Sequence, residues 1–450
     1  MKNSALLTAH WPLIGILVGS FLITVSMGTY TNWDAQLEYQ AATSIITGGF
    51  PIVTGGLMIN QPPLGFYTTA SVLGVFGVSY LNSVTVVAAF GLGCVALVYI
   101  LGAVLYGRRS GFVAAALFGL VPWHVYMSRI FLIDNQCLFL SLLFLIIGVL
   151  AVKRNSERLI LVSGVVFALA FLTKLFAVFW LVPLLLVAYF GKKEGAFNFS
   201  IRNVAFFVLP SIVAQAIWFG GFANQNFFGV YFSSDFTHPV LVVDPSPLFL
   251  PITFYKSAGL FLFLAGLFSL VLAVAYRKKL GALLRLDIVC LVTIAVILGL
   301  DMLLVFGFHL TVPYVSAFKY NYAALPFFCL LAASLADKGA VLLNSLARER
   351  FWVIKPVLGV VGLVLLLATL VESLLFLNAW TGFVAFGVDS VTYYGFVVNS
   401  DAVETGVLLF LHYMAGGLLG VSLVLAAFID HAKTAVDTIR SNTREKNNPK

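Results

Sequence analysis

The chain has 450 residues, of which 61% are hydrophobic and only 10% are charged, and its formal net charge is +8. A soluble domain cannot bury so much apolar surface, so the composition predicts a polytopic membrane protein. The positive charge is spread along the chain and forms no basic domain, which argues against a nucleic-acid partner and points to membrane topology.

Apolar runs of membrane-spanning length recur throughout the chain and predict an all-α fold with about twelve transmembrane helices. The expected spans are 11–29, 84–106, 110–127, 136–152, 158–173, 175–190, 203–222, 258–276, 286–308, 319–337, 352–377 and 405–429. Residues 1–430 then form a single integral membrane domain, and residues 431–450 form a polar cytoplasmic tail. The first span lacks a following small-residue cleavage site and is expected to be a retained anchor.

The segment 62–82 is apolar enough to be a further span, and charge distribution decides against it. If this segment does not cross, 22 of the 26 Lys and Arg residues fall on one side of the membrane, together with both termini. Cytoplasmic loops carry such an excess of positive charge. We therefore expect a multi-pass protein of the cell membrane with both termini cytoplasmic, and a helix within 62–82 lying at the outer interface.

This topology leaves four basic residues on the outer side: Arg129, Lys174, Lys256 and Lys319. Some of them are explained by ordinary exceptions or by side chains that reach out of the bilayer. The alternative is that they bind an anionic ligand at the outer face. The larger outer loops are expected at 30–83, 223–257, 309–318 and 378–404.

The first outer loop contains two carboxylates at helical spacing, Asp34 and Glu38, in a helix that Gly48 and Gly49 end. One interpretation is structural, because an acid in the first turn favours the helix dipole. The other is that both carboxylates point into a cavity above the membrane, where they act as catalytic acid–base groups. Further along this loop, the QPPLGFY segment begins a helix at its two prolines and carries Gln61 and Tyr67.

The run VPWHVYMSRIFLID, residues 121–134, places His124, Arg129 and Asp134 in and beside a short outer turn. Charge held so near the bilayer needs a partner. The structural interpretation is an ion pair between Arg129 and Asp134. In the functional interpretation, Arg129 or His124 contacts the substrate, and Asp134 orients a neighbouring side chain. Lys174, inside an apolar run, must likewise reach water, find a carboxylate or bind a phosphate.

Two later segments offer candidates at the same face. Lys319 is flanked by Tyr314, Tyr320 and Tyr322, which are typical of an interfacial aromatic belt but also suit a substrate cavity, and His309 lies nearby. Loop 223–257 contains Asp and His residues besides Lys256, but their spacing matches no strong metal signature, so we predict no metal site and leave a divalent-metal requirement open. Asp301 and Glu372 receive no role.

These motifs, in this order, resemble the GT-C glycosyltransferases of the protein O-mannosyltransferase and aminoarabinose-transferase type. The resemblance rests on WDAQLEY, the Pro-Pro helix NQPPLGFY, the basic turn LGAVLYGRRSG, SRIFLIDNQ, LTK and a late KYNY followed by proline. It covers residues 1–190 well and the remainder loosely. The family often has Glu where this chain has Ala35, and His or Lys where it has Gln61.

The resemblance implies transfer of a sugar from a polyisoprenyl-phosphate donor to an acceptor hydroxyl, with inversion, at the extracytoplasmic face. The acceptor is a protein, a lipid or a glycan, and no cofactor is predicted. Asp34 is then the general base, with Glu38 and Asp134 as further catalytic acids. Arg129, Lys174, Lys319 and Lys256 are expected to hold the donor phosphate. The expected cavity residues are His124, Gln61, Tyr67, Tyr320, Tyr322 and His309.

Two other classes of function remain open. A lipid or solute transporter or flippase usually has internal repeats and polar residues at the bilayer midplane, and neither is evident here. An inactive subunit with the GT-C fold is the second alternative, because Ala35 replaces the family's usual second acid.

Overall fold

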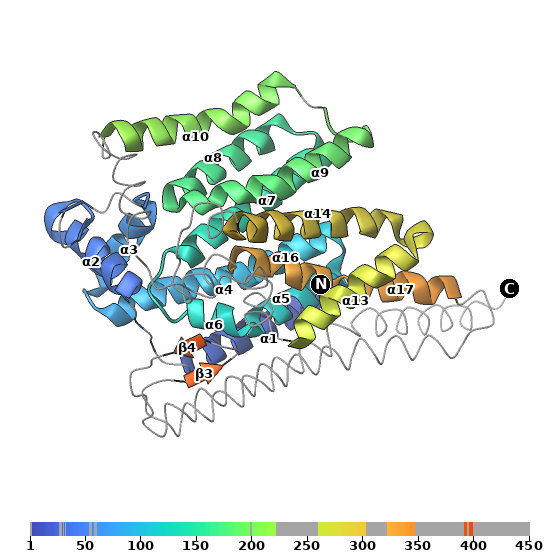
Figure 1. The fold of residues 1–450 in the computed structure, drawn as a ribbon, viewed down its shortest axis with the longest axis horizontal. Helices are drawn as coiled ribbons and strands as arrows, with labels where there is room; N and C mark the ends of the chain where they lie inside the picture. The colour runs from blue at the N-terminus through green and yellow to red at the C-terminus, as the bar shows by residue number, and fades with distance from the viewer. Residues whose placement is uncertain are drawn as a thin grey trace.

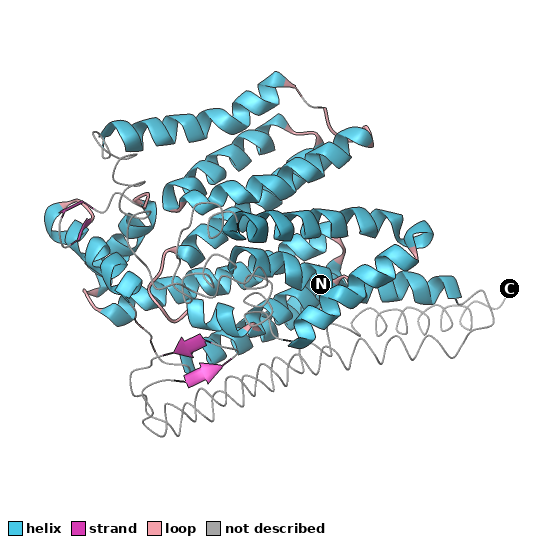
Figure 2. Cartoon of the chain, viewed as in Figure 1, coloured by secondary structure: helices cyan, strands magenta, loops and turns pink. Residues whose placement is uncertain are grey.

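The computed structural model describes residues 2–26, 29, 31, 33–53, 56–57, 61–198, 200–221, 260–302, 322–346, 391–393 and 396–398. These residues form a bundle of helices with two short antiparallel hairpins (Figure 2). The expected spans at 352–377 and 405–429, and the tail 431–450, lie outside the described residues. The membrane-protein class and the helical fold are confirmed, while the count of twelve spans stays a prediction.

The elements of the N-terminal half are α1 (Lys2–Ser26), α2 (Trp33–Gly48), β1 (Ile52–Val53), β2 (Gly56–Leu57), α3 (Leu64–Phe76), α4 (Tyr80–Leu105), α5 (Arg108–Leu120), α6 (Pro122–Met127), α7 (Asp134–Arg154), α8 (Glu157–Thr173), the 3₁₀ helix η1 (Leu175–Trp180), α9 (Leu181–Lys193) and α10 (Ile201–Gly221). After residue 260 come α13 (Leu260–Ala275), α14 (Arg277–Met302), the 3₁₀ helix η3 (Tyr322–Ala324), α16 (Leu325–Ala333), α17 (Leu335–Leu346), β3 (Val391–Tyr393) and β4 (Phe396–Val398). Both hairpins lie within predicted outer loops.

Five helical stretches among the described residues are long and apolar enough to cross a membrane: Tyr80–Leu105, Asp134–Arg154, Leu175–Lys193, Ile201–Trp218 and Arg277–Gly299. Each overlaps an expected span. The expected span 110–127 is divided into α5 and α6 at Pro122, and the expected span 319–337 includes η3, α16 and the start of α17. Breaks of this kind are tolerated at membrane depth where neighbouring helices bury the backbone.

The Pro-Pro segment does form a helix, α3, with Pro63 at its N-cap. Its 13 residues span about 20 Å, less than the hydrocarbon core of roughly 30 Å. The helix stops at Gly77, whose φ of 94° is unfavourable for other residues. Ser79 then caps α4 by accepting from the amide of Asn82. A helix this short, followed by a tight turn, agrees with the prediction that it lies at the surface without crossing.

Helices α2 and α3 pack on each other at one end of the bundle, at the left of Figure 1, while α17 lies at the other end. Several large apolar side chains remain exposed near the end of α3, including Val75 and Phe76. Helix α10 likewise exposes Leu209, Ile212 and Ile217. In a protein of this composition such surfaces face lipid.

A buried polar network joins the C-terminal helices to the turn between α4 and α5. Lys338 of α17 and Asp287 of α14 form an ion pair of 2.6 Å, with both side chains fully buried. Tyr106 donates to Asp287 at 3.1 Å, and Ser110 donates to Asp337 at 2.5 Å. Lys338 is one of the 22 basic residues expected on the cytoplasmic side. Its burial and its pairing with Asp287 make it a structural residue of the bundle.

Candidate active site

Several of the predicted site residues lie in or beside the link between α6 and α7, residues 128–133. This link passes between α2, α4 and the start of α7 and is buried along its whole length. The rings of Tyr80 and Phe131 both pack edge-to-face against the ring of Tyr39 in α2. The Tyr80 hydroxyl also accepts a hydrogen bond from the Phe131 amide at 3.3 Å. The first outer segment and the 121–134 segment, separate in sequence, thus form one unit.

Asp34 lies in the first turn of α2, and its side chain is partly buried. Its carboxylate and the phenol of Tyr80 both lie within electrostatic range of the phenol of Tyr126 in α6. Ala35, where the resembling family often has Glu, is fully buried in the main hydrophobic core. The methyl group of residue 35 therefore packs inside the core.

Glu38 is buried and its Oε2 accepts a hydrogen bond from the amide of Ile133 at 2.9 Å. Ile133 is the N-cap residue of α7. A carboxylate at this position satisfies an amide that the helix cannot satisfy and complements the helix dipole. Glu38 thus docks α2 onto the start of α7. Its role as a second catalytic acid stays a prediction.

Asp134 and Lys174 form a buried ion pair. The Lys174 ammonium lies 2.8 Å from both carboxylate oxygens of Asp134, and both side chains are almost completely buried. Lys174 stands at the break between α8 and η1, so the pair fixes this break against the first turn of α7. Lys174 was expected to reach water, to pair with a carboxylate or to bind a phosphate. In the structure it pairs with the carboxylate of Asp134.

His124 and Tyr322 belong to a polar chain through the core. The Tyr322 hydroxyl donates to Oδ1 of Asn135 at 2.5 Å and lies 2.7 Å from Nδ1 of His124. Because the single phenolic hydrogen is directed to Asn135, His124 donates from Nδ1. The amide group of Asn135 donates in turn to the Ser128 hydroxyl at 3.1 Å. This chain ties η3, far along the sequence, to both sides of the 128–133 link.

The backbone of α4 is close to this chain at Gly91. A Cβ added there would lie 2.3 Å from the Ser128 hydroxyl and 2.9 Å from the Asn135 amide nitrogen. Only glycine leaves the space that this part of the polar chain occupies. No pattern in the sequence indicates this requirement.

The two predicted cavity residues of the Pro-Pro segment are Tyr67, which lies in α3, and Gln61, which precedes it. The Tyr67 hydroxyl donates to the Gly49 carbonyl at 2.7 Å, which joins α3 to the end of α2, and burial raises the pKa of the Tyr67 phenol. Gln61 lies just before α3 and is partly buried. Tyr67 therefore has a structural contact with the end of α2.

A small cavity borders the Asp134–Lys174 pair. It is also lined by Cys137, Trp180 and Tyr322, and its volume of about 20 Å³ is enough for roughly one water molecule. The pair and Tyr322 thus line the same small cavity inside the bundle.

Some of the predicted site residues lie in segments that the structure does not describe, and one residue of the polar chain was not predicted from the sequence. Lys256, Lys319, Tyr320 and His309 lie outside the described residues. Arg129 is buried within the 128–133 link. Within the described ranges no cluster of three or more His, Cys, Asp or Glu side chains suits a metal ion. Sequence reasoning missed Asn135, although it follows Asp134 directly in the SRIFLIDNQ motif.

Residues 60–218 match the family model described as dolichyl-phosphate-mannose-protein mannosyltransferase. Among curated proteins, none matches the chain significantly. The fold is similar to that of ArnT from Cupriavidus metallidurans, solved bound to undecaprenyl phosphate, with 13% identity and a TM-score of 0.55 over 95% of this chain and 77% of ArnT. The apo form of ArnT gives 15% identity and a TM-score of 0.57 over 94% and 77% of the two chains.

The archaeal oligosaccharyltransferase AglB from Archaeoglobus fulgidus, solved with an inhibitory peptide and a dolichol-phosphate, shares the fold as well. The identity is 14% and the TM-score 0.51, over 83% of this chain and 56% of AglB. This chain thus spans little more than half of that larger protein. Residues 60–218, about a third of the chain, thus resemble the dolichyl-phosphate-mannose-protein mannosyltransferases, and the fold is that of ArnT and AglB.

Proposed function

We propose that the protein transfers a sugar from a polyisoprenyl-phosphate donor to an acceptor hydroxyl at the extracytoplasmic face, with inversion at the anomeric carbon and Asp34 as general base. The observation that carries this proposal is the position of Asp34: a partly buried carboxylate at the start of α2, within electrostatic range of Tyr126 in the segment that matches the mannosyltransferase family. The lipid-phosphate donor is suggested by the undecaprenyl phosphate bound to ArnT and the dolichol-phosphate bound to AglB.

The chemistry needs a base on one side of the sugar and positive charge on the other. An acceptor hydroxyl loses its proton as it attacks the anomeric carbon, and a carboxylate such as Asp34 takes it. The bond to the donor phosphate breaks at the same time, and the departing phosphate gains negative charge. Attack opposite the leaving group inverts the anomeric configuration.

Arg129 is the described cation best suited to the donor phosphate. It lies within the 128–133 link, which joins α6 to the start of α7. A guanidinium offers several donors in a geometry that suits phosphate, and its effect is greatest where water is excluded. Lys256 and Lys319 remain proposed phosphate ligands from segments outside the described residues.

The remaining acids and Lys174 are proposed to position these groups. Glu38 holds α2, and hence Asp34, against α7. Lys174 holds the first turn of α7 through Asp134. A displacement of about 1 Å in such supports is enough to lower turnover strongly. His124 and Tyr322 support the opposite side of the 128–133 link.

The test uses the purified full chain reconstituted with a panel of polyprenyl-phosphate-linked sugars, with released lipid phosphate as the readout. We expect the wild type to release lipid phosphate only when an acceptor is present. Asp34→Asn removes the base but keeps the shape of the side chain, so turnover should fall by about 10²–10⁴-fold while donor binding is retained.

Glu157→Gln is the matched control, because this carboxylate lies on α8 at the other end and pairs only with exposed Arg202 in the described structure. It should turn over like the wild type. Full activity of Asp34→Asn would remove Asp34 from the mechanism. No turnover with any donor by a folded wild-type protein would favour the inactive-subunit alternative.

A further inference from the structure

An apolar crevice lies between α7, α8, α9 and α10, away from the candidate active site. Its lining includes Val152, Ile160, Leu184, Ala188, Phe197 and Asn203. Its volume is about 200 Å³. Apolar cavities of similar size stay free of water and accept apolar guests. The crevice is therefore suited to hydrocarbon.

Glycines let the helices around the crevice approach each other closely. A Cβ at Gly148 would lie 2.6 Å from Leu184, and a Cβ at Gly191 would lie 2.6 Å from Val152. Three further lining residues, Leu185, Val204 and Val208, are also exposed on the surface of the bundle. The crevice thus communicates with the surface that faces lipid, and a chain in the bilayer reaches it without crossing the protein.

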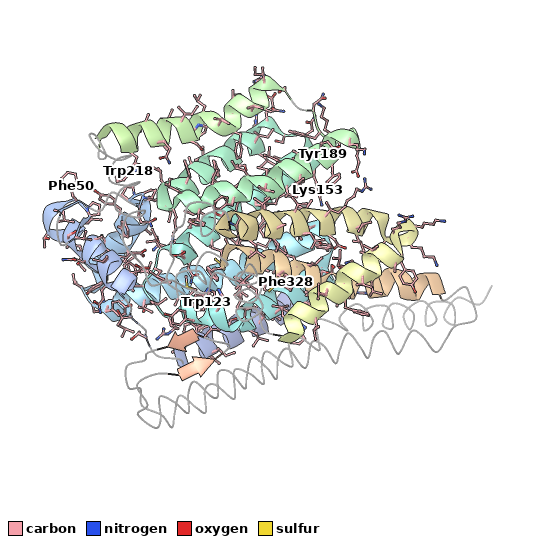
Figure 3. All side chains as sticks on the ribbon, viewed as in Figure 1. Phe50, Trp123, Lys153, Tyr189, Trp218 and Phe328 are labelled. Carbon is pink, nitrogen blue, oxygen red and sulfur yellow. The ribbon has the colours of Figure 1, made fainter. Side chains whose placement is uncertain are left out.

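Among the described residues, basic side chains lie around one end of the crevice. They stand within about two turns of lining residues, at the ends of the four helices, and all are exposed: Arg154, Arg158, Lys192, Lys193 and Arg202. Lys153 and Tyr189, labelled in Figure 3, lie at this same end. The acids there are Glu157, which pairs with Arg202 at 3.3 Å, and Glu194, which pairs with Arg285. The surroundings therefore carry an excess of positive charge.

One polar atom at the crevice lacks a partner among the described residues. Asn203 is buried, and its side-chain nitrogen donates to the Asn198 carbonyl at 2.8 Å, which leaves Oδ1 without a hydrogen bond. A buried acceptor without a partner is unfavourable, because it has lost its hydrogen bonds to water. A ligand with a hydroxyl donor beside its charged group satisfies this acceptor, whereas a hydrocarbon chain alone does not.

We propose that this crevice is a binding site for an anionic glycerophospholipid of the leaflet that the charge distribution assigns to the cytoplasm. One acyl chain fills the crevice, the phosphate lies among Arg154, Lys192 and Lys193, and a headgroup hydroxyl donates to Asn203. Each basic residue near an anionic lipid surface contributes favourably to such binding. This site differs from the donor site, which is expected at the opposite face, so a lipid here supports the bundle.

The test measures retained lipid on the delipidated full-length protein after incubation with mixed micelles that contain equal phosphatidylglycerol and phosphatidylcholine. Native mass spectrometry counts the bound molecules. We expect the wild type to retain phosphatidylglycerol at least fivefold over phosphatidylcholine. The triple substitution Arg154→Gln/Lys192→Gln/Lys193→Gln changes only exposed side chains and should abolish this preference. Ala188→Phe fills the crevice and should lower retention of both lipids.

The control is Arg277→Gln/Lys278→Gln, which removes exposed charges at the turn between α13 and α14. It should retain phosphatidylglycerol like the wild type. Equal retention of both lipids by the wild type would overturn the proposal, and so would an unchanged preference in the triple variant. Loss of the preference in the control to the same extent would show general attraction to positive charge and would equally overturn a defined site.

Discussion

At the scale of single residues, the most consequential interaction near the candidate site is the Asp134–Lys174 pair. Both groups are almost fully removed from solvent and meet at 2.8 Å. Taking two charges out of water is expensive, so a buried pair adds little net stability, but removal of one partner leaves an uncompensated charge. The pair therefore acts mainly by specifying how α7 and the α8–η1 break fit together.

Lys174→Met tests this interpretation. It leaves Asp134 buried without its counter-charge, and we expect a loss of about 3–5 kcal/mol in the free energy of unfolding, measured by denaturant titration in detergent. The double variant Asp134→Asn/Lys174→Met removes both charges and should recover part of that loss. A single variant as stable as the wild type would refute a structural role for the pair.

Tyr322 tests the polar chain in the same core. Tyr322→Phe removes the hydroxyl that donates to Asn135 and accepts from His124, so two buried polar groups lose a partner. We expect a loss of about 1–3 kcal/mol in thermal or denaturant unfolding. Tyr189→Phe is the control, because that tyrosine is exposed on α9, and it should leave stability unchanged. Equal stability of the two variants would contradict the chain.

At the scale of elements, α2 is the helix on which the mechanism depends, and Glu38 is its contact with α7. Glu38→Gln keeps an oxygen acceptor for the Ile133 amide, whereas Glu38→Ala removes it. If Glu38 only docks α2, the Gln variant should retain most of its turnover, and the Ala variant should lose about 1.5–3 kcal/mol of stability together with turnover.

A catalytic role of Glu38 would give a different pattern of turnover and stability in these two variants. If Glu38 transfers a proton, Glu38→Gln should lose turnover by about 10²-fold or more while the protein stays as stable as the wild type. Measurement of turnover and of unfolding on the same two variants therefore separates the two roles. Asp34→Asn serves as the reference for loss of an acid without loss of packing.

Across the whole molecule, the polar groups divide between the two ends of the bundle. The candidate catalytic residues lie around α2, α6 and the start of α7, while the Lys338–Asp287 network and the exposed basic clusters lie at the other end. The predicted topology places the first end outside the cell and the second in the cytoplasm.

Cysteine labelling tests this orientation. The four native cysteines are buried and free, so they are first replaced by serine or alanine. Ser71→Cys on exposed α3 should react with a membrane-impermeant maleimide added to intact cells, and Ala196→Cys after α9 should react only once the membrane is opened. Reaction of Ala196→Cys alone in intact cells would reverse the orientation and exclude an extracytoplasmic site.

The sequence by itself determined the class of the protein, the positions of most described spans and the helical nature of the segments with Asp34 and the Pro-Pro pair. These features depend on local composition: a run of apolar residues must be helical in lipid because its backbone has no other hydrogen-bond partner. Charge bias likewise predicted that α3 does not cross, since each basic cluster contributes to topology by itself.

Only the tertiary structure decided which polar residues meet. Lys174 is equally compatible with a phosphate or a carboxylate until Asp134, forty residues away, is placed beside it. From the sequence, Tyr322 is typical of an interfacial aromatic residue, but in the structure it bonds to His124 and Asn135. Lys338 is typical of a cytoplasmic surface charge, but in the structure it forms a buried ion pair with Asp287. Such contacts depend on how helices distant in sequence pack, and the pairing energy of each charge exists only once water is excluded around both partners.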